Sequence, residues 1–325
     1  MFHWGLLGAG DIVRKRVAAA LRDTPGSTLL GVARARAELA ASFAASVGAK
    51  RSYDDWQDLV ADEAIDGVYI ATPVQWHAGQ AIAAAEAGKH VLCEKPMAMN
   101  TTECDRMIAA CRASGVTLGV AYYRHFYPVI ARIKQILASG EIGRPVLARI
   151  DVFEHFNPAP DDPRHWFVKA GEAGGGPMFD FGCHRLEVLL HLFGSVQRVS
   201  GTTANVVFDR EVEDVATASL QFASGPVATL VVTHAAMEPR DTLEIFGTEG
   251  SIHVPNLNAG QLRVVLRGRE RVEAHPAAAN LHAPLVEDFV AAVAGGREPA
   301  VTGLVGRTVA SLEDAIYGRQ AFDSR

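Results

Sequence analysis

The first part of the chain alternates short apolar runs with alanine-rich amphipathic stretches, and this alternation constrains the fold more than any other feature. The apolar runs have the length of buried strands, and the stretches between them carry apolar residues at helical spacing. Strands that alternate with helices in this way build βαβ units around a parallel sheet. We therefore predict a doubly wound α/β domain over residues 1–121. The expected strand segments are HWGLLGAG, STLLGVA, GVYIATP, KHVLCEK and VTLGVAYY.

The rhythm changes after about residue 122. Segments such as ATASLQFAS and PVATLVVTHAA alternate apolar and polar residues, as strands with one wet face do. Short glycine-containing turns separate neighbouring segments, which favours an antiparallel meander. A helical stretch lies within this half, and two more helical segments close the chain. The prediction is a second domain over 122–325 of the α+β type, with an open, mainly antiparallel sheet.

The first strand runs through a glycine-containing turn directly into a helix. In this context, Gly8 makes the tight turn and Gly10 lets the backbone approach a pyrophosphate, which then lies at the positive helix N-terminus. We predict that Gly8, Gly10, Asp11 and Ile12 contact a dinucleotide. Val13 occupies the place of the third small residue of the usual fingerprint, so the helix must pack differently there.

The end of the second strand indicates which dinucleotide is bound. A carboxylate at this place would hold the ribose 2′-hydroxyl of NAD, but here Arg34 and Arg36 precede the next acid, Glu38. A guanidinium can grip a 2′-phosphate through charge-assisted hydrogen bonds. The sequence therefore favours NADP, with NAD possible and with Arg34 as the contact. An exposed loop arginine with no such role is the alternative.

Two more segments place polar residues at the carboxyl edge of the predicted sheet, where open α/β sheets bind ligands. Thr72 and Pro73 follow one strand, with His77 at the start of the next helix, and we predict that all three contact the cofactor. The next strand ends in Glu94-Lys95-Pro96. A lysine there can hydrogen-bond the substrate oxygen and pass it a proton during carbonyl reduction. A surface ion pair is the alternative for Glu94 and Lys95.

The second half supplies Asp180 and His184, four residues apart on a predicted helix. A histidine titrates near neutral pH, and a carboxylate can orient or charge it. Two other interpretations stay open at this point. Asp180 can simply cap the helix, or His184, Glu187 and His191 can lie on one helical face as metal ligands. The preferred prediction has no metal.

These motifs, in this order, resemble those of the glucose-fructose oxidoreductase / inositol dehydrogenase (Gfo/Idh/MocA) family. The resemblance rests on GLLGAGDI, IATPVQWHAGQAIAAAEAGKHVLCEKPMA, GGGPMFDFGCH and TLEIFGTEGSI, and it runs over nearly the whole chain. It implies that Lys95 is catalytic, that Glu94 lies on the cofactor side, and that Asp180 and His184 complete the site. Arg34 in place of the acid is similar to NADP-using members.

The resemblance also implies an organisation above the single chain. In this family a Rossmann domain precedes a domain with a large open β-sheet, which commonly makes subunit contacts. The expectation for this chain is thus an NAD(P)-binding domain over 1–121, a substrate-binding and oligomerisation domain over 122–325, and a homo-oligomer, either a dimer or a tetramer.

Composition excludes several classes of protein. The chain has 37 acidic and 31 basic residues, a net charge of −6, so nothing indicates a nucleic-acid surface. No stretch approaches the roughly 20 apolar residues of a membrane span. The N-terminus lacks the pattern of a signal peptide, and the four cysteines lack metal or disulfide spacing. A cytoplasmic protein with no membrane partner is the expectation.

The predicted function is that of an NAD(P)-dependent dehydrogenase or reductase. It would transfer a hydride between nicotinamide and a CH–OH or C=O carbon of a sugar, cyclitol or related polyol. Lys95, Asp180, His184 and Tyr123 would contact this substrate. Two rivals remain: a non-catalytic NAD(P)-binding regulator, and a redox-assisted elimination or hydrolysis of a glycoside with the cofactor kept bound.

Overall fold

The computed structural model describes residues 1–323 and divides them into two compact units. The first unit is Met1–Tyr123 together with Ala278–Arg307, and the second is Arg124–Ala277 together with the chain from Thr308 onward. None of the helices in residues 1–323 combines the length and apolar character that crossing a membrane requires.

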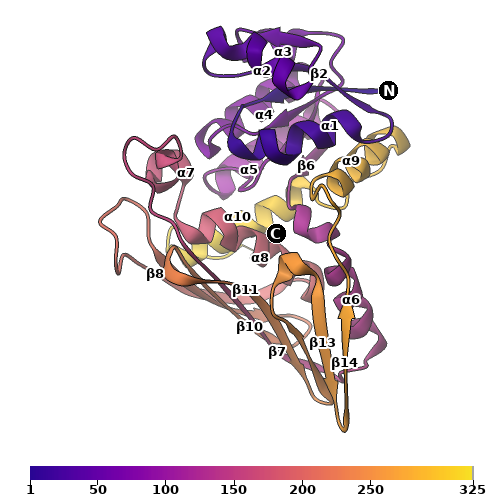
Figure 1. The fold of residues 1–325 in the computed structure, drawn as a ribbon, viewed down its shortest axis with the longest axis vertical. Helices are drawn as coiled ribbons and strands as arrows, with labels where there is room; N and C mark the ends of the chain where they lie inside the picture. Colours follow the sequence, from indigo (N-terminus) through magenta and orange to yellow (C-terminus); the bar gives the residue numbers. More distant parts are fainter. Residues whose placement is uncertain (324–325) are drawn as a thin grey trace. The chain divides into compact units, whose positions relative to one another are not determined.

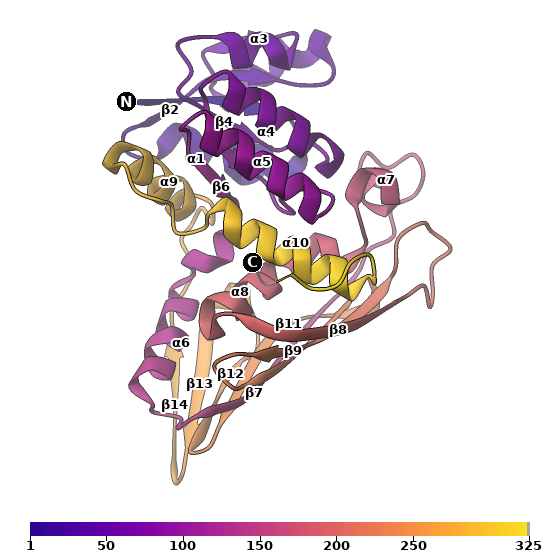
Figure 2. The same ribbon diagram turned by 180° about the vertical axis from the view of Figure 1, so that it is seen from behind.

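The first unit is built on a six-stranded parallel sheet in the order β3-β2-β1-β4-β5-β6. Helices α1 and α9 lie on one side of the sheet (Figure 1), and α4 and α5 lie on the other (Figure 2). The sheet is therefore doubly wound, as the sequence predicts. The strands are β1 (Phe2–Leu7), β2 (Ser27–Ala33), β3 (Arg51–Tyr53), β4 (Gly67–Ile70), β5 (His90–Cys93) and β6 (Leu118–Val120). The helical segments are η1 (Val13–Val17), α1 (Ala18–Asp23), η2 (Ala37–Leu39), α2 (Ala40–Val47), α3 (Trp56–Ala61), η3 (Val74–Trp76), α4 (His77–Glu86), α5 (Thr101–Ala113) and α9 (Ala283–Gly295).

The strands of this sheet form where the sequence has apolar runs because both faces are covered by helices. Strands β4 and β5 are buried almost throughout. The exception is β3, whose three residues are exposed or half-buried. No apolar run marks β3, and the sequence analysis did not predict it.

Residues 278–307 differ from the sequence prediction, which assigned everything after residue 121 to the second domain. In the structure they return to the first unit. The physical reason is aromatic packing: Phe289 of α9 is buried, with its ring 5.5 Å from that of Trp4 in β1. The first unit therefore contains a segment that the chain supplies only after building the second sheet.

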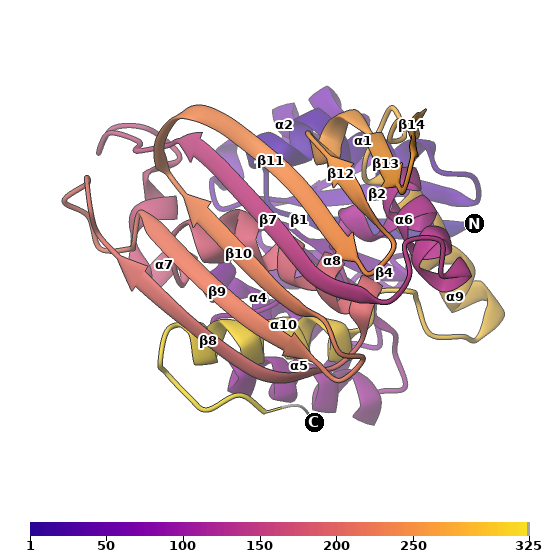
Figure 3. The same cartoon turned by 90° about the horizontal axis from the view of Figure 1, so that it is seen from below.

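The second unit is built on an eight-stranded sheet in the order β14-β13-β12-β11-β7-β10-β9-β8 (Figure 3). Only the β7–β10 pair is parallel among these described strands. The strands are β7 (Pro145–His155), β8 (Val196–Ala204), β9 (Val215–Phe222), β10 (Val227–Thr233), β11 (Ala235–Gly247), β12 (Gly250–Val254), β13 (Gln261–Leu266) and β14 (Arg269–Ala274). The helical segments are α6 (Pro128–Ser139), η5 (His165–Val168), α7 (Ala170–Ala173), η6 (Met178–Gly182), α8 (Cys183–Phe193) and η7 (Leu257–Ala259). Helices η4 (Tyr123–Phe126) and α10 (Gly303–Ile316) each span the boundary between the units.

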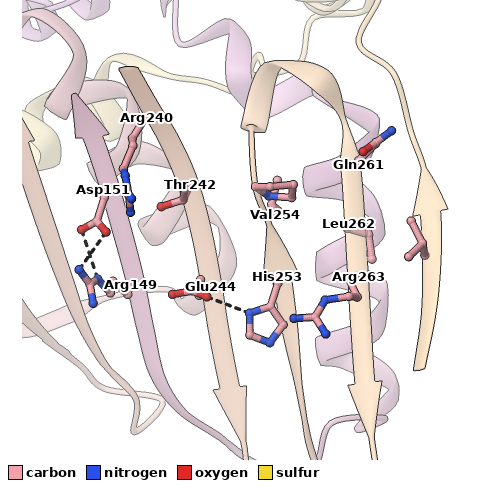
Figure 4. A pocket seen from close by; sticks show the side chains of 12 residues that line it. Arg149, Asp151, Arg240, Thr242, Glu244, His253, Val254, Gln261, Leu262 and Arg263 are labelled. Atoms are coloured by element: carbon pink, nitrogen blue, oxygen red, sulfur yellow. Dashed lines mark hydrogen bonds and ion pairs between the residues drawn. The ribbon is translucent and has the colours of Figure 1, made fainter. Parts of the chain in front are cut away.

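One face of this sheet is apolar and covered, while the other is more polar. Along β9, buried and exposed residues alternate without a break. Helix α8 lies behind the sheet in the view of Figure 3, on the covered face. Figure 4 shows polar side chains on β7, β11 and β12: Arg149 pairs with Asp151 within β7, and Glu244 of β11 pairs with His253 of β12. An open, mainly antiparallel sheet is thus confirmed.

Candidate active site

The turn between β1 and η1 has the geometry that a dinucleotide-binding loop requires. Gly8 has φ of 110°, and a Cβ built on it would lie 2.4 Å from the carbonyl oxygen of Ala71, after β4. Only glycine fits there. A Cβ on Gly10 would meet no protein atom within 4 Å. Protein packing therefore does not require glycine at this position, whereas the close approach of a pyrophosphate would.

The helix after this turn opens unusually, at the place where the fingerprint's third small residue is missing. Residues Val13–Val17 form a π-helical turn before α1 begins, and Val13 and Val17 are both buried. The adjacent Asp11 is exposed and pairs with Lys15 one turn later. This is the different packing that the sequence analysis expected from Val13.

Arg34 follows β2, and its guanidinium lies over the ring of Phe43, with its central carbon 5.5 Å from the ring centroid. A second guanidinium, that of Arg14, lies 5.0 Å from the same centroid. Phe43 is almost completely buried, so its ring is a fixed surface for the two guanidinium groups. Both cations gain from the aromatic ring. The structure thus brings two arginines from different elements to the same ring just beyond β2, and Arg14 was not among the predicted contacts of the 2′-phosphate.

His77 links two of the predicted motifs. Its ring is buried, with Nε2 lying 2.8 Å from the carbonyl oxygen of Thr72 and Nδ1 lying 3.0 Å from that of Pro96. Burial lowers the pKa of His77, although these carbonyl groups act in the opposite direction. The hydroxyl of Thr72 donates to Gln80 of α4 at 2.7 Å. The segments after β4 and β5 are therefore held in a fixed relation.

Glu94 is a buried carboxylate directly beside Lys95, and it accepts hydrogen bonds from the Tyr69 hydroxyl at 2.7 Å and from the Lys95 backbone N–H at 3.2 Å. His282 Nε2 lies 3.4 Å from the same carboxylate. Burial acts to raise the pKa of Glu94, but His282, Lys95 and Tyr69 outweigh burial and lower it. Glu94 is not half of an exposed surface ion pair, so that alternative does not describe this site.

Tyr123, which was predicted to contact substrate, lies over the same cluster. Its ring centroid is 4.6 Å from that of His282, and both rings are buried. His282 precedes α9, within the returning segment 278–307. The return of the chain thus brings a histidine to Glu94 across 188 positions of sequence.

Asp180 and His184 lie in the second unit, on a helix that also opens with a π-helical turn. Asp180 belongs to η6 and His184 to α8. The N-caps of these helices are Pro177 and Gly182, neither with a side-chain cap, so Asp180 is not a cap. π-helical turns occur frequently at functional sites.

The Asp180 carboxylate lies 3.5 Å from Nε2 of His234, which follows β10 and is buried. The other nitrogen of His234, Nδ1, lies 3.1 Å from a guanidinium nitrogen of Arg210. Asp180, His234 and Arg210 thus lie in a row, with the Asp180 carboxylate partly exposed at one end. His184 is itself almost completely buried.

The glycines that precede η6 pack against a second buried carboxylate. A Cβ on Gly176 would lie 2.1 Å from the carbonyl oxygen of Glu213. The Glu213 carboxylate accepts from the backbone N–H groups of Gly176 at 2.7 Å and Met178 at 3.2 Å, and from the Tyr317 hydroxyl. Glu213 therefore anchors the turn on which Asp180 stands.

Replacing Glu213 by alanine should destabilise the second unit strongly, because three donors lose their charged acceptor. We expect a loss of about 3 kcal/mol or more in the free energy of unfolding, which corresponds to a fall of roughly 6–12 °C in Tm. Glu211→Ala is the matched control, since Glu211 is exposed and pairs with Lys169 at the surface. Equal melting temperatures for the two variants, measured by calorimetry, would contradict the anchoring role.

Several residues of these networks were not predicted from the sequence, among them Gln80, Glu213, His234 and His282. Each acts across tertiary contacts, so no spacing pattern marks it. Glu213 comes closest to an exception. The glycine run before η6 indicates that another part of the chain packs closely there, but it does not indicate which residue.

Comparison with known proteins identifies the family to which this chain belongs. Residues 2–122 match the model of the oxidoreductase family with an NAD-binding Rossmann fold, and residues 130–253 match the GFO/IDH/MocA C-terminal domain. The chain belongs to the Gfo/Idh/MocA family. The fold and family predicted from the sequence are confirmed.

Some relatives of this chain are named as enzymes that act on sugars. The 1,5-anhydro-D-fructose reductase of Ensifer adhaerens is 32% identical, with 93% of this chain and 91% of the relative covered. Among solved structures, a levoglucosan dehydrogenase in complex with NADH and levoglucosan is 27% identical, with a TM-score of 0.89, and 98% of this chain and 96% of the other are covered. The aldose-aldose oxidoreductase of Caulobacter crescentus, in complex with glycerol, is 25% identical, with a TM-score of 0.89 and coverage of 98% and 97%.

Proposed function

We propose that this protein oxidises a CH–OH group of a sugar, cyclitol or related polyol, or reduces the corresponding carbonyl, with NADP as the preferred cofactor. The bound cofactor would accept the hydride as NADP or supply it as NADPH. The chain's own residues would bind the substrate, orient it and move a proton at its oxygen. Orientation is a large part of such catalysis, since effective molarities of well-placed groups supply about 7–11 kcal/mol.

One observation carries the proposal: Lys95 stands at the carboxyl end of β5, beside a buried Glu94 with a lowered pKa. In the reductive direction, we propose that Lys95 hydrogen-bonds the carbonyl oxygen and gives it a proton. In the oxidative direction, the neutral amine would take the hydroxyl proton while the carbon loses its hydride.

His184 and Asp180 are proposed to act on the same substrate oxygen and its neighbours. His184 would share the proton movement with Lys95, and Asp180 would hold a substrate hydroxyl or orient His184. The contact of Asp180 with His234 supports a fixed carboxylate. Tyr123 is proposed as a further substrate contact.

The preference for NADP is supported by charge. Arg34 and Arg14 both lie against Phe43, beyond the end of β2, where the 2′-position of the ribose is recognised in such folds. A dianionic phosphate bound there would be attracted to both guanidinium groups. Gly8, Gly10, Asp11, Ile12, Thr72 and Pro73 are proposed to form the rest of the cofactor site. His77, predicted as a further cofactor contact, holds the carbonyl group of Thr72.

A substrate screen tests the proposal. Purified protein would be mixed with aldoses, ketoses, anhydro sugars and cyclitols, each with NADP or NADPH, and followed by nicotinamide absorbance. We expect at least one polyhydroxylated compound to drive a change that equals the product formed. Consumption of a glycoside with no net change in NADPH would instead show redox-assisted elimination. Cofactor binding with no turnover of any compound would support a regulator.

The open face of the second sheet is proposed as the contact surface of a homo-oligomer. Leu147 of β7 and Val227 of β10 are paired in register, and each is 38% exposed on this face. The neighbouring ion pairs shown in Figure 4 add polar contacts around them. Sedimentation of the intact protein at micromolar concentration should show a dimer or tetramer. Leu147→Glu should shift it toward the monomer, and a wild-type protein that is strictly monomeric would contradict the proposal.

A further inference from the structure

A cluster of two histidines and a glutamate lies in the second unit, outside every residue that the proposed function uses. His125 comes from η4, and Glu187 and His191 come from α8. One possible ligand atom from each residue lies within 4.8 Å of the other two. Glu187 and His191 are four residues apart, so they face the same side of the helix.

Within the cluster, one oxygen of the Glu187 carboxylate accepts no hydrogen bond from a described residue. Oε1 of Glu187 lies 2.7 Å from Nδ1 of His125, while Oε2 is buried and receives no hydrogen bond from any described residue. The Glu187 side chain is only 1% exposed. A buried carboxylate oxygen without a partner is costly. The ring of His191 lies close to that of His125, with 3.8 Å between centroids.

A cation already approaches this cluster. Nζ of Lys134, from α6, lies 3.4 Å from Nδ1 of His191. The side chain of His125 is 15% exposed, so the cluster opens to solvent beside it. The cluster is therefore a buried acid with two imidazoles and an access route, rather than a sealed ion pair.

We propose that His125, Glu187 and His191 bind a divalent transition metal of the zinc type. Two imidazoles and one carboxylate are a donor set that Zn²⁺ uses, with water in the fourth position. Tetrahedral ligand atoms lie about 3.3 Å apart when the bonds are about 2.0–2.1 Å. The His125–Glu187 pair would have to open slightly from its present 2.7 Å. The metal would give Oε2 or Oε1 a partner and tie η4 to α8.

From the sequence, the preferred prediction had no metal, and the alternative set of ligands used His184 in place of His125. Helical spacing correctly brings Glu187 and His191 together, but the third ligand comes from an element 62 positions earlier. The metal would be separate from the proposed catalytic residues, so its loss and the loss of hydride transfer are distinguishable.

The test is metal binding by the full-length protein after treatment with a chelator. Zn²⁺ would be titrated in competition with a chromophoric chelator, with Co²⁺ as a spectroscopic substitute and Mg²⁺ as the hard-cation control. We expect one Zn²⁺ per chain, a visible absorption band with Co²⁺ typical of low coordination number, and no saturable binding of Mg²⁺.

Variants locate the site. His191→Ala removes a ligand at the edge of the cluster and should weaken Zn²⁺ binding by about tenfold or more. Lys134→Met removes a competing cation and should tighten it by about three- to tenfold. His275→Ala, which removes a histidine from another His–Glu pair of the same unit, should change nothing. Absence of saturable Zn²⁺ binding at micromolar concentrations in the wild type, or unchanged affinity in both His191→Ala and Lys134→Met, would overturn the proposal.

Discussion

Replacing Lys95 by alanine should lower the turnover number by about 10²–10⁴, the usual contribution of a positioned acid–base group. The affinity for NADPH should change little, because the phosphate turn at Gly8 and the arginines at Phe43 remain. The measurement is steady-state turnover with a substrate from the screen, together with the dissociation constant for NADPH.

The Lys95→Arg variant separates charge from proton transfer. Arginine keeps the positive charge but does not release a proton near neutral pH. If Lys95 is the acid and base, this variant should be nearly as slow as Lys95→Ala. Turnover close to that of the wild type in a folded Lys95→Ala protein would exclude Lys95 from the proton step.

Replacing Arg34 by aspartate should shrink or reverse the preference for NADPH over NADH. Loss of the charge-assisted hydrogen bonds to a 2′-phosphate costs roughly 1.5–3 kcal/mol, or about tenfold to a hundredfold in affinity. The new carboxylate would also repel the phosphate and offer an acceptor to the ribose of NADH. Dissociation constants of both cofactors for wild type and variant give the result directly.

Arg14 provides a second arm of the same experiment. Because its guanidinium also lies against Phe43, Arg14→Ala should reduce the NADPH preference without improving NADH binding. Arg112→Ala, at an exposed position on α5, is the matched control and should leave both constants unchanged. Equal affinities for NADPH and NADH in the wild type would remove the basis of the NADP assignment.

Features that depend on neighbours in sequence were predicted well. Strands β1, β2, β4, β5 and β6 form where apolar runs stand, because a sheet covered on both faces selects for such runs. Gly8 and Lys95 fall at strand ends, as expected, because both follow directly from an apolar run.

Features that depend on tertiary contacts were not predicted. The contact of His282 with Glu94 and that of His234 with Asp180 join residues far apart in the chain. No periodicity records such a pair. The return of 278–307 to the first unit was not predicted for the same reason. Phe289, which packs on Trp4, stands in an amphipathic helical pattern that any surface helix can have.

The most direct test of the central claim follows a labelled hydrogen. A polyol identified in the screen would be deuterated at the reacting carbon and oxidised with NADP, and the NADPH formed would be analysed by mass spectrometry. Direct hydride transfer predicts one deuterium in each NADPH, with Lys95→Ala giving the same label at a much lower rate. Unlabelled NADPH, or substrate consumed with no NADPH released, would contradict the proposed reaction.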